Sequence, residues 1–321
     1  MPDWNWMNGW GAYNPPQFEP ADPPQHILYQ QLYAQAAMAQ LLEARKPRVE
    51  VPKIEDEDTM INTFRVGCDP EFMLLDKEGK TVAASTYFPI HGPIGYDHGG
   101  RVAEFRPDPA RGIYSLVRKI QGLIKSPTMK AVSARLRSGA LCNRDCLGGH
   151  IHLGFNAFEE KPPTNVGIWG GGKFNARGAQ VTKALDTLTK KLEYLDILPK
   201  NESAQRRASA QGQGNHYGEY GDVRDCNGHM EYRTMASWLY DPRVAFLCLT
   251  AAKLAAADPE GSYSALKDCD SFSDLMKWIE TYKTKDLNAA RVSEKLVGGG
   301  HKNLQIDPTV DFRDRWEELG L

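Results

Sequence analysis

The sequence has little net charge and contains no long apolar run. Its formal charge is −2 over 321 residues, so no overall positive field would attract nucleic acid, and any phosphate-binding site must be local. The longest apolar stretch, residues 244–257, is interrupted by Lys253 and is shorter than the roughly 20 residues needed to span a bilayer. These absences predict that neither nucleic acid nor a membrane is a partner of this protein.

The sequence also lacks a secretory signal, a disulfide-rich composition and a phosphate-binding P-loop. It begins Met-Pro-Asp-Trp-Asn-Trp, with neither a basic segment nor an apolar one, so we expect a cytoplasmic protein. The six cysteines are then expected to be reduced thiols. Residues 170–174, Gly-Gly-Gly-Lys-Phe, have neither the spacing nor the terminal Ser or Thr of a P-loop.

What is present is an ordinary globular composition, 41% hydrophobic and 25% charged, divided into three segments. Residues 1–25 are rich in Pro and Gly but carry several aromatic side chains, which predicts an arm that docks on a protein partner. The alternative for this arm is a solvated tail with incidental aromatics. Residues 26–60 combine an amphipathic helix with an acidic linker, and residues 61–321 form the main domain.

Within residues 61–321, strands and helices mix without regular βαβ alternation, so the predicted fold class is α+β. Alternating polar and apolar residues predict strands near residues 63–75, 81–87, 101–106, 149–155 and 229–234. Apolar residues at helical spacing predict helices at about 110–138, 178–197, 242–257, 271–282 and 286–297. Several of these helices are expected to pack on one side of the sheet.

Four of the predicted strands each carry two charged or histidine side chains separated by one residue. The two-residue period of a strand places both members of a pair on one face and the intervening apolar residue on the other. The pairs are Asp69 and Glu71, Glu104 and Arg106, His150 and His152, and Glu231 and Arg233. A solvated face with cross-strand ion pairs explains any single pair. The whole set contains only residue types that bind metals and phosphates, which favours a functional site.

If these strands are neighbours, their carboxylates crowd on one surface and raise one another's pKa unless a cation is present. Oxygen-rich ligation favours Mg2+ or Mn2+, with an imidazole of His150 or His152 as an additional ligand. The planar, permanently charged guanidinium groups of Arg106 and Arg233 suit phosphate oxygens. Asp97 stands just upstream, in a Gly-rich turn. The pattern therefore predicts a site for metal and phosphate.

Four short motifs within residues 62–260 give more specific information about the class of protein. They are Gly-Cys-Asp-Pro-Glu-Phe at 67–72, Ala-Glu-Phe-Arg-Pro at 103–107, Gly-Gly-His-Ile-His-Leu-Gly at 148–154 and Met-Glu-Tyr-Arg-Thr at 230–234. In this order they resemble the carboxylate–amine ligases (amidoligases) encoded by tailed phages, which belong to the glutamine synthetase and glutamate–cysteine ligase superfamily. The resemblance implies a curved, mainly antiparallel sheet with helices on one side. It also implies ATP and Mg2+ or Mn2+ as cofactors.

The same resemblance implies a reaction and a set of site residues. ATP would phosphorylate a small-molecule or peptide carboxylate, and an amine would then displace the phosphate to form an amide. The implied metal ligands are Asp69, Glu71, Glu104, His150 and Glu231. Arg233 would contact the γ-phosphate and act in catalysis together with Glu231 and Arg106. Arg224 and His152 would bind the nucleotide, and Asp97 is a further site candidate.

Three more expectations accompany this resemblance. Asp69 stands where the superfamily often has a glutamate, and its shorter side chain is expected to loosen or shift one metal site. A phage-encoded ligase would work in the host cytoplasm or be associated with the virion. The choice of carboxylate and amine would depend on loops such as 85–100, 155–178 and 200–228.

Zinc binding is the first alternative. Cys142, Cys146, His150 and His152 lie within eleven residues and supply the ligand types of a structural zinc site. Two histidines at strand spacing rarely both reach one ion, however, and zinc would leave the carboxylate-bearing strands unexplained. The carboxylate-rich metal site is therefore the preferred interpretation.

Two further alternatives use other parts of the chain. Cys68 or Cys226 with a histidine would supply a nucleophile, but scattered cysteines of this kind are more often small buried hydrophobes. A non-catalytic docking protein on a ligase-like fold, associated with a virion or another assembly, would use residues 1–25 as its working part. Binding or turnover of ATP with Mg2+ distinguishes this docking protein from a ligase.

Overall fold

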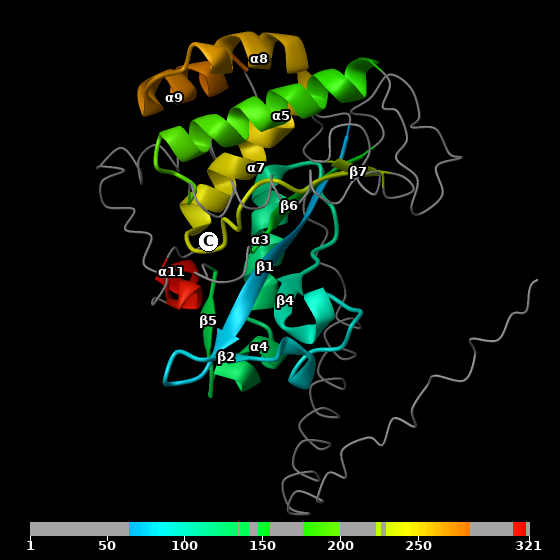
Figure 1. The fold of residues 1–321 in the computed structure, drawn as a ribbon, viewed down its shortest axis with the longest axis vertical. Helices are drawn as coiled ribbons and strands as arrows, with labels where there is room; N and C mark the ends of the chain where they lie inside the picture. Colours follow the sequence, from blue (N-terminus) through cyan, green and yellow to red (C-terminus); the bar gives the residue numbers. More distant parts are fainter. Residues whose placement is uncertain are drawn as a thin grey trace, which may run out of the picture. The chain divides into compact units, whose positions relative to one another are not determined.

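The computed structural model describes residues 64–133, 135–140, 147–154, 176–199, 223–225, 229–282 and 311–318 (Figure 1). The chain divides into two units, Met1–Lys53 and Ile54–Leu321, and every described residue belongs to the second. The predicted arm at 1–25, the segment 26–60 and the predicted helix at 286–297 lie outside the described residues. None of the helices in the described ranges combines the length and the hydropathy that crossing a membrane requires.

An antiparallel sheet carries the predicted polar pairs. Its main path within the described ranges runs β3, β4, β1, β6, β8, β7, while β2 and β5 pair with the second half of β1. The strands are β1 Val66–Leu75, β2 Thr81–Val82, β3 Ile94–Asp97, β4 Val102–Phe105, β5 Arg137–Gly139, β6 Gly149–Gly154, β7 Val223–Asp225 and β8 His229–Tyr232. The four strands with polar pairs, β4, β1, β6 and β8, are therefore direct neighbours.

The two faces of the sheet differ in polarity, as the two-residue period predicts. On β1, Val66, Phe72 and Leu74 belong to the main hydrophobic core, while Asp69 and Glu71 occupy the alternate positions. The Phe72 ring stacks on that of Phe105 in β4, with centroids 4.6 Å apart. Other core side chains of the same face are Ala103, Ile151, Leu153, Met230 and Tyr232. The prediction that each polar pair shares one face is confirmed for these strands.

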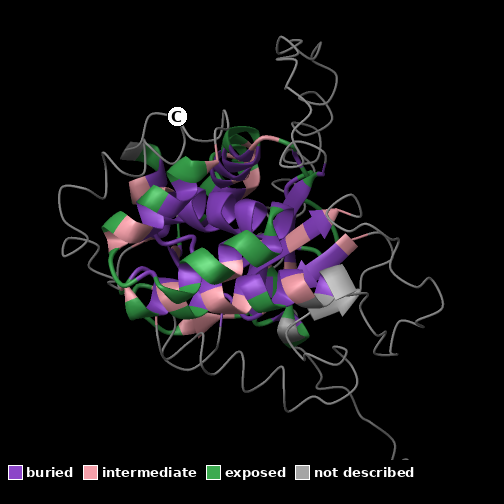
Figure 2. Cartoon of the chain, turned by 90° about the horizontal axis from the view of Figure 1, so that it is seen from above, coloured by how far each residue is buried: buried purple, intermediate pink, exposed green. Residues whose placement is uncertain are grey.

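Helices cover the apolar face of the sheet (Figure 1). The helices in contact with the sheet are α3 Ile113–Ile124 on β1, α7 Pro242–Ala257 on β6, and α5 Ala176–Tyr194, whose Thr189 hydroxyl lies 2.8 Å from that of Tyr232 in β8. Two more helices pack on these: α8 Pro259–Lys267 on α5 and α7, and α9 Phe272–Thr281 on α8. Every residue of α7 except Arg243 is buried, which matches its nearly continuous apolar sequence and the purple centre of Figure 2. The predicted α+β class, with an antiparallel sheet and helices on one side, is confirmed.

Several predicted boundaries were wrong for local reasons. The strand expected at 81–87 ends at Val82, and Ala84–Thr86 forms a 3-10 turn, η1. The helix expected at 110–138 is interrupted before Pro127, because proline supplies no N–H to the preceding turn and begins a new helix instead. That helix is α4, Pro127–Ser133, and β5 follows it. The prediction missed β3, β5, β7 and α8, three short strands and a helix that begins at a proline.

A short helix near the end of the chain, α11 Phe312–Glu318, was also missed. Phe312 packs edge-on against Phe72, with ring centroids 5.6 Å apart. Trp316 is fully buried, and its indole Nε1 donates a hydrogen bond to the Leu239 carbonyl at 2.7 Å. This helix therefore completes the core directly beneath the strand that carries Asp69 and Glu71.

Candidate active site

The register of the sheet gathers the predicted polar side chains. The opposed residue pairs are Asp69 and His150 across β1 and β6, Glu71 and Glu104 across β1 and β4, and His152 and Glu231 across β6 and β8. Opposed residues in antiparallel strands have Cβ atoms about 4.5–5.5 Å apart, so their side chains interact directly. The polar face of four neighbouring strands is thus one continuous site.

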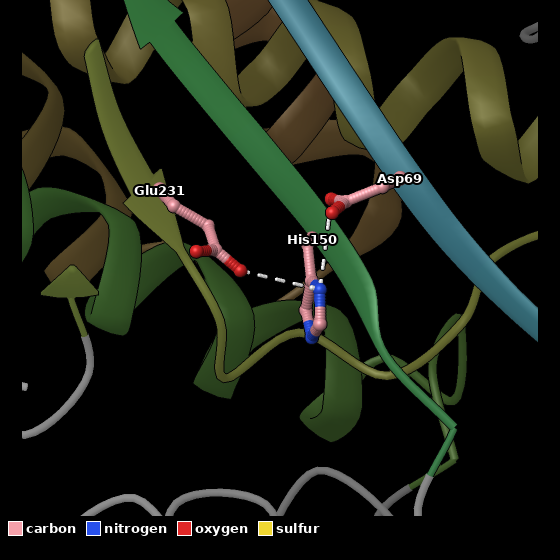
Figure 3. Close-up of side chains that lie close together, drawn as sticks. All are labelled: Asp69, His150 and Glu231. Atoms are coloured by element: carbon pink, nitrogen blue, oxygen red, sulfur yellow. Dashed lines mark ion pairs between the residues drawn. The ribbon is translucent and has the colours of Figure 1, made fainter. Parts of the chain in front are cut away.

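Asp69, His150 and Glu231 form the first ligand group, which we term the histidine group. The Nδ1 atom of His150 lies 3.5 Å from Asp69 Oδ1 and 3.4 Å from Glu231 Oε1 (Figure 3). One ligand atom from each residue lies within 4.8 Å of those of the other two. His152 borders this group, because its Nε2 lies 2.5 Å from Asp69 Oδ1.

Glu71, Asp97 and Glu104 form the second ligand group, which we term the carboxylate group. Their ligand atoms also lie within 4.8 Å of one another. Glu71 and Glu104 are only 6% and 4% exposed, whereas Asp97 is exposed at the end of β3. The Gly148 amide donates a hydrogen bond to Glu71 Oε2 at 2.5 Å. The sequence named Asp97 as a further candidate, and the structure places it with two of the proposed ligands.

Burial and neighbouring charges shift the pKa values of four site residues. Burial would raise the pKa of Asp69 and of Glu231, but nearby histidines, joined by Arg233 in the case of Glu231, lower both values. Burial also disfavours a charged His152, yet the carboxylate of Asp69 raises the pKa of this imidazole. For Glu104, burial and Asp69 outweigh its neighbour Arg106, so its pKa rises to about 8.

The chemistry of both groups fits a hard divalent cation. The carboxylate group offers only oxygen ligands, and the histidine group offers oxygen ligands with one imidazole, a combination suited to Mg2+ or Mn2+. Like charges stand close together in the carboxylate group, where Glu71 and Glu104 face each other. A cation would convert this repulsion into attraction. Asp69, Glu71, Glu104, His150 and Glu231, the five predicted ligands, all belong to these groups.

The predicted arginines occupy different environments. Arg233 follows β8 and places Nη1 3.6 Å from Glu231 Oε1, at the border of the histidine group. Arg106 pairs with Glu104 through Nε and Nη2. The backbone of Arg224 in β7 lies opposite Glu231, and its side chain lies outside the described set. Two of the three arginines are thus placed beside carboxylates of the site.

A cavity of about 390 Å³ adjoins the histidine group. Its polar lining includes Asp69, His152 and Arg106, together with Arg65 and His229. The rings of His152 and His229 lie 4.8 Å apart, centroid to centroid. Neither Arg65 nor His229 was predicted from the sequence to belong to the site. Extending the two-residue period backwards, from Asp69 to Arg65 and from Glu231 to His229, would have found both.

Of the four cysteines considered as nucleophiles or zinc ligands, Cys68 is the one within the described residues. Cys68 is buried, and burial, with the charge of Asp69, raises the pKa of its thiol well above the usual value, which does not suit a nucleophile. Cys226 and the predicted zinc ligands Cys142 and Cys146 lie outside the described residues. Of the other two predicted zinc ligands, both His150 and His152 approach Asp69 Oδ1.

Together, fold and site define an α+β protein whose antiparallel sheet presents metal-type ligand groups on its polar face. The chain belongs to the family described as phage phiEco32-like COOH.NH2 ligase-type 2, whose model matches residues 66–159 and 179–294, more than half of the chain. The predicted resemblance to carboxylate–amine ligases is thereby confirmed. No curated protein matches this chain.

Solved structures give a more distant likeness. A bifunctional glutathione synthetase from Pasteurella multocida is 10% identical, with a TM-score of 0.43, and the match covers 81% of this chain and 52% of that one. A GmaS/ADP complex is 14% identical over 80% and 73% of the two chains, with a TM-score of 0.38. A glutamine synthase homologue is 15% identical over 80% and 71%, with a TM-score of 0.32. This chain spans about half the length of the glutathione synthetase chain, and at these scores the likeness carries no argument about function.

Proposed function

We propose that this protein is an ATP- and Mg2+-dependent carboxylate–amine ligase that forms an amide through an acyl phosphate. The observation that carries the proposal is the meeting of two ligand groups at His150. Its Nδ1 faces Asp69 and Glu231, while its Nε2 lies 3.9 Å from Glu71 Oε1 in the carboxylate group. Membership of a carboxylate–amine ligase family supports the same reaction class.

In this proposal each ligand group holds a divalent cation. The histidine group would bind one through Asp69, His150 and Glu231, and the carboxylate group would bind another through Glu71, Asp97 and Glu104. Bound cations would supply the positive charge that neutralises the triphosphate and the acceptor carboxylate. Because both groups lie on rigid neighbouring strands, the two anionic substrates would be held close together without mutual repulsion.

The reaction needs no nucleophile from the protein. An oxygen of the acceptor carboxylate attacks the γ-phosphorus in line, and the bond to the β-phosphate oxygen breaks to release ADP. The nitrogen of the amine then attacks the carbonyl carbon of the acyl phosphate, phosphate leaves, and the nitrogen loses a proton to give the amide. Arg233, beside Glu231, would donate hydrogen bonds to the transferred phosphoryl group. The cavity next to Asp69 and His152 would bind part of a substrate.

The test is a screen of amino acids, short peptides and polyamines for phosphate release from ATP by the purified full-length chain. We expect release to require Mg2+ or Mn2+, a carboxylate and an amine, with an amide product detected by mass spectrometry. Replacing Glu231→Gln should reduce the rate by roughly a hundredfold or more, because one preorganised charge is lost. Glu78→Gln, in the exposed turn that follows β1, is the matched control.

An isotope experiment tests the acyl phosphate itself. With an acceptor whose carboxylate oxygens are labelled with oxygen-18, one labelled oxygen should appear in the released phosphate. Unlabelled phosphate alongside amide formation would overturn the acyl-phosphate route. Phosphate release that Glu231→Gln leaves unchanged would overturn the assignment of the site.

A further inference from the structure

We infer that Arg106 is a positioning residue, which holds strand β3 against β4 and so places Asp97 beside Glu71 and Glu104. The inference rests on the proposed function, because it concerns the carboxylate group of that site. It gives Arg106 a role different from the phosphate contact that its charge suggests. Gly95 is the second residue on which this role depends.

All the nitrogen atoms of the Arg106 guanidinium contact acceptors from its own chain. Nε and Nη2 pair with the Glu104 carboxylate. Nη1 donates to the Ile90 carbonyl at 2.9 Å and points to that of Gly92 at 3.5 Å, while Nη2 approaches the Tyr96 carbonyl at 3.4 Å. An arginine has five N–H bonds directed from three nitrogen atoms, and each of the three nitrogens has at least one of these contacts. The guanidinium therefore joins Glu104 to the segment 90–96.

Gly95 makes room for this arrangement. It lies opposite Glu104 in the ladder between β3 and β4, so the guanidinium of Arg106 passes over its Cα. A Cβ built on Gly95 would lie 1.9 Å from Nη1 and 2.7 Å from Cζ of Arg106. Even an alanine side chain would therefore displace the guanidinium from its present position.

The same contacts determine where Asp97 lies. Asp97 is two residues beyond Gly95 and therefore on the same face of β3. In the described ranges β3 is an edge strand of four residues that pairs only with β4. Apart from this short ladder, the Arg106 backbone amide donates to the Pro93 carbonyl at 2.7 Å, and the side chain holds the carbonyls on both sides of Gly95. Loss of the side-chain contacts would leave only the ladder and this backbone bond to hold the strand that carries Asp97, and its position beside Glu104 would be less well defined.

Direct measurement of Mn2+ binding to the full-length chain without nucleotide, by titration calorimetry, tests the inference. The wild-type chain should bind two ions. Gly95→Ala and Arg106→Lys should each weaken one of them by about tenfold or more, the usual effect of losing a group that orients a ligand, and leave the other unchanged. The matched control is Gly122→Ala in α3, where an added Cβ meets nothing within 4 Å.

The outcomes separate a positioning role from a phosphate contact. If Arg106→Lys weakens ATP binding while both variants keep both Mn2+ affinities, Arg106 contacts phosphate and the inference is overturned, although the proposed function stands. If the wild-type chain binds no Mn2+, both ideas fail. Retention of one unaltered Mn2+ site, with an unchanged melting temperature of the metal-free protein, shows that a variant has folded and that the effect is confined to the carboxylate group.

Discussion

Glu71 and Glu104 face each other directly on β1 and β4, and both are almost completely buried. Opposed like charges destabilise a pair of strands, and here the pKa of Glu104 rises to about 8, mainly through burial and Asp69. In a sheet face with a purely structural role, this arrangement would not contribute to stability. Cation binding at the carboxylate group would account for it, because a divalent ion between the side chains would reverse the sign of the interaction.

A substitution of Asp97 alone tests whether the carboxylate group binds a metal ion. Replacing Asp97→Asn should weaken one of two Mn2+ sites by about tenfold or more, since one charged oxygen ligand is lost. The free energy of unfolding of the metal-free protein should change by less than about 0.5 kcal/mol, because the side chain is exposed. Mn2+ titration and urea denaturation measure the two effects. Asp108→Asn, equally exposed after β4, is the control, and unchanged Mn2+ binding in Asp97→Asn would remove Asp97 from the site.

Among the elements, α11 supports the site strand from a distant part of the sequence. Its Phe312 packs edge-on against Phe72 and Phe105, and the side-chain amide of Gln121 in α3 donates a hydrogen bond to the Trp316 carbonyl at 3.2 Å. Asp311, just before the helix, accepts a hydrogen bond from the Ser138 amide in β5 at 3.1 Å. A segment distant in sequence thus closes the core beneath Asp69 and Glu71.

Truncating the indole of α11 should therefore cost much stability. We expect Trp316→Ala to lower the free energy of unfolding by about 3–5 kcal/mol, because a fully buried aromatic ring and its hydrogen bond are lost. Urea denaturation followed by circular dichroism measures this. Glu317→Ala, at the exposed neighbouring position, should change it by less than about 0.5 kcal/mol. Equal, small effects of both substitutions would show that α11 does not belong to the core.

At the scale of the whole molecule, the helices lie on one face of the sheet and the ligand groups on the other. Helices cover the apolar face, whereas the polar face buries the side chains of Glu71, Glu104, His150 and Glu231. That face carries the electrostatic cost of its clustered carboxylates, which bound cations would offset. Stability and metal binding should therefore be coupled through the native state.

This coupling predicts a metal-dependent melting temperature. Chelation should lower the melting temperature, and Mg2+ or Mn2+ should restore it, since a ligand at a hundred times its dissociation constant stabilises a protein by about 2.7 kcal/mol. Differential scanning fluorimetry measures the shift, with K+ at equal ionic strength as the control for screening. The double variant Glu104→Gln and Glu231→Gln should lose the shift. A full metal response in that variant would place the bound ions elsewhere.

The sequence by itself determined which side chains share a face. The two-residue period is a local property of the extended chain, so the pairs on β1, β4, β6 and β8 could be assigned without knowing how the strands are arranged. Strong periodic patterns likewise predicted α5, α7 and α9 closely. The same order of short motifs led to the family that the comparison then confirmed.

Only the tertiary structure decided which of these side chains meet and what each one contacts. Strand order and register depend on contacts between distant segments, so the division into a histidine group and a carboxylate group was not readable from spacing. The missed strand β3 has only four residues, including a glycine, yet it brings Asp97 to Glu104 and the Tyr96 carbonyl to Arg106. The charge of Arg106 predicted an anionic partner. In the structure that partner is Glu104, two residues earlier, and the guanidinium lies against Gly95 of β3.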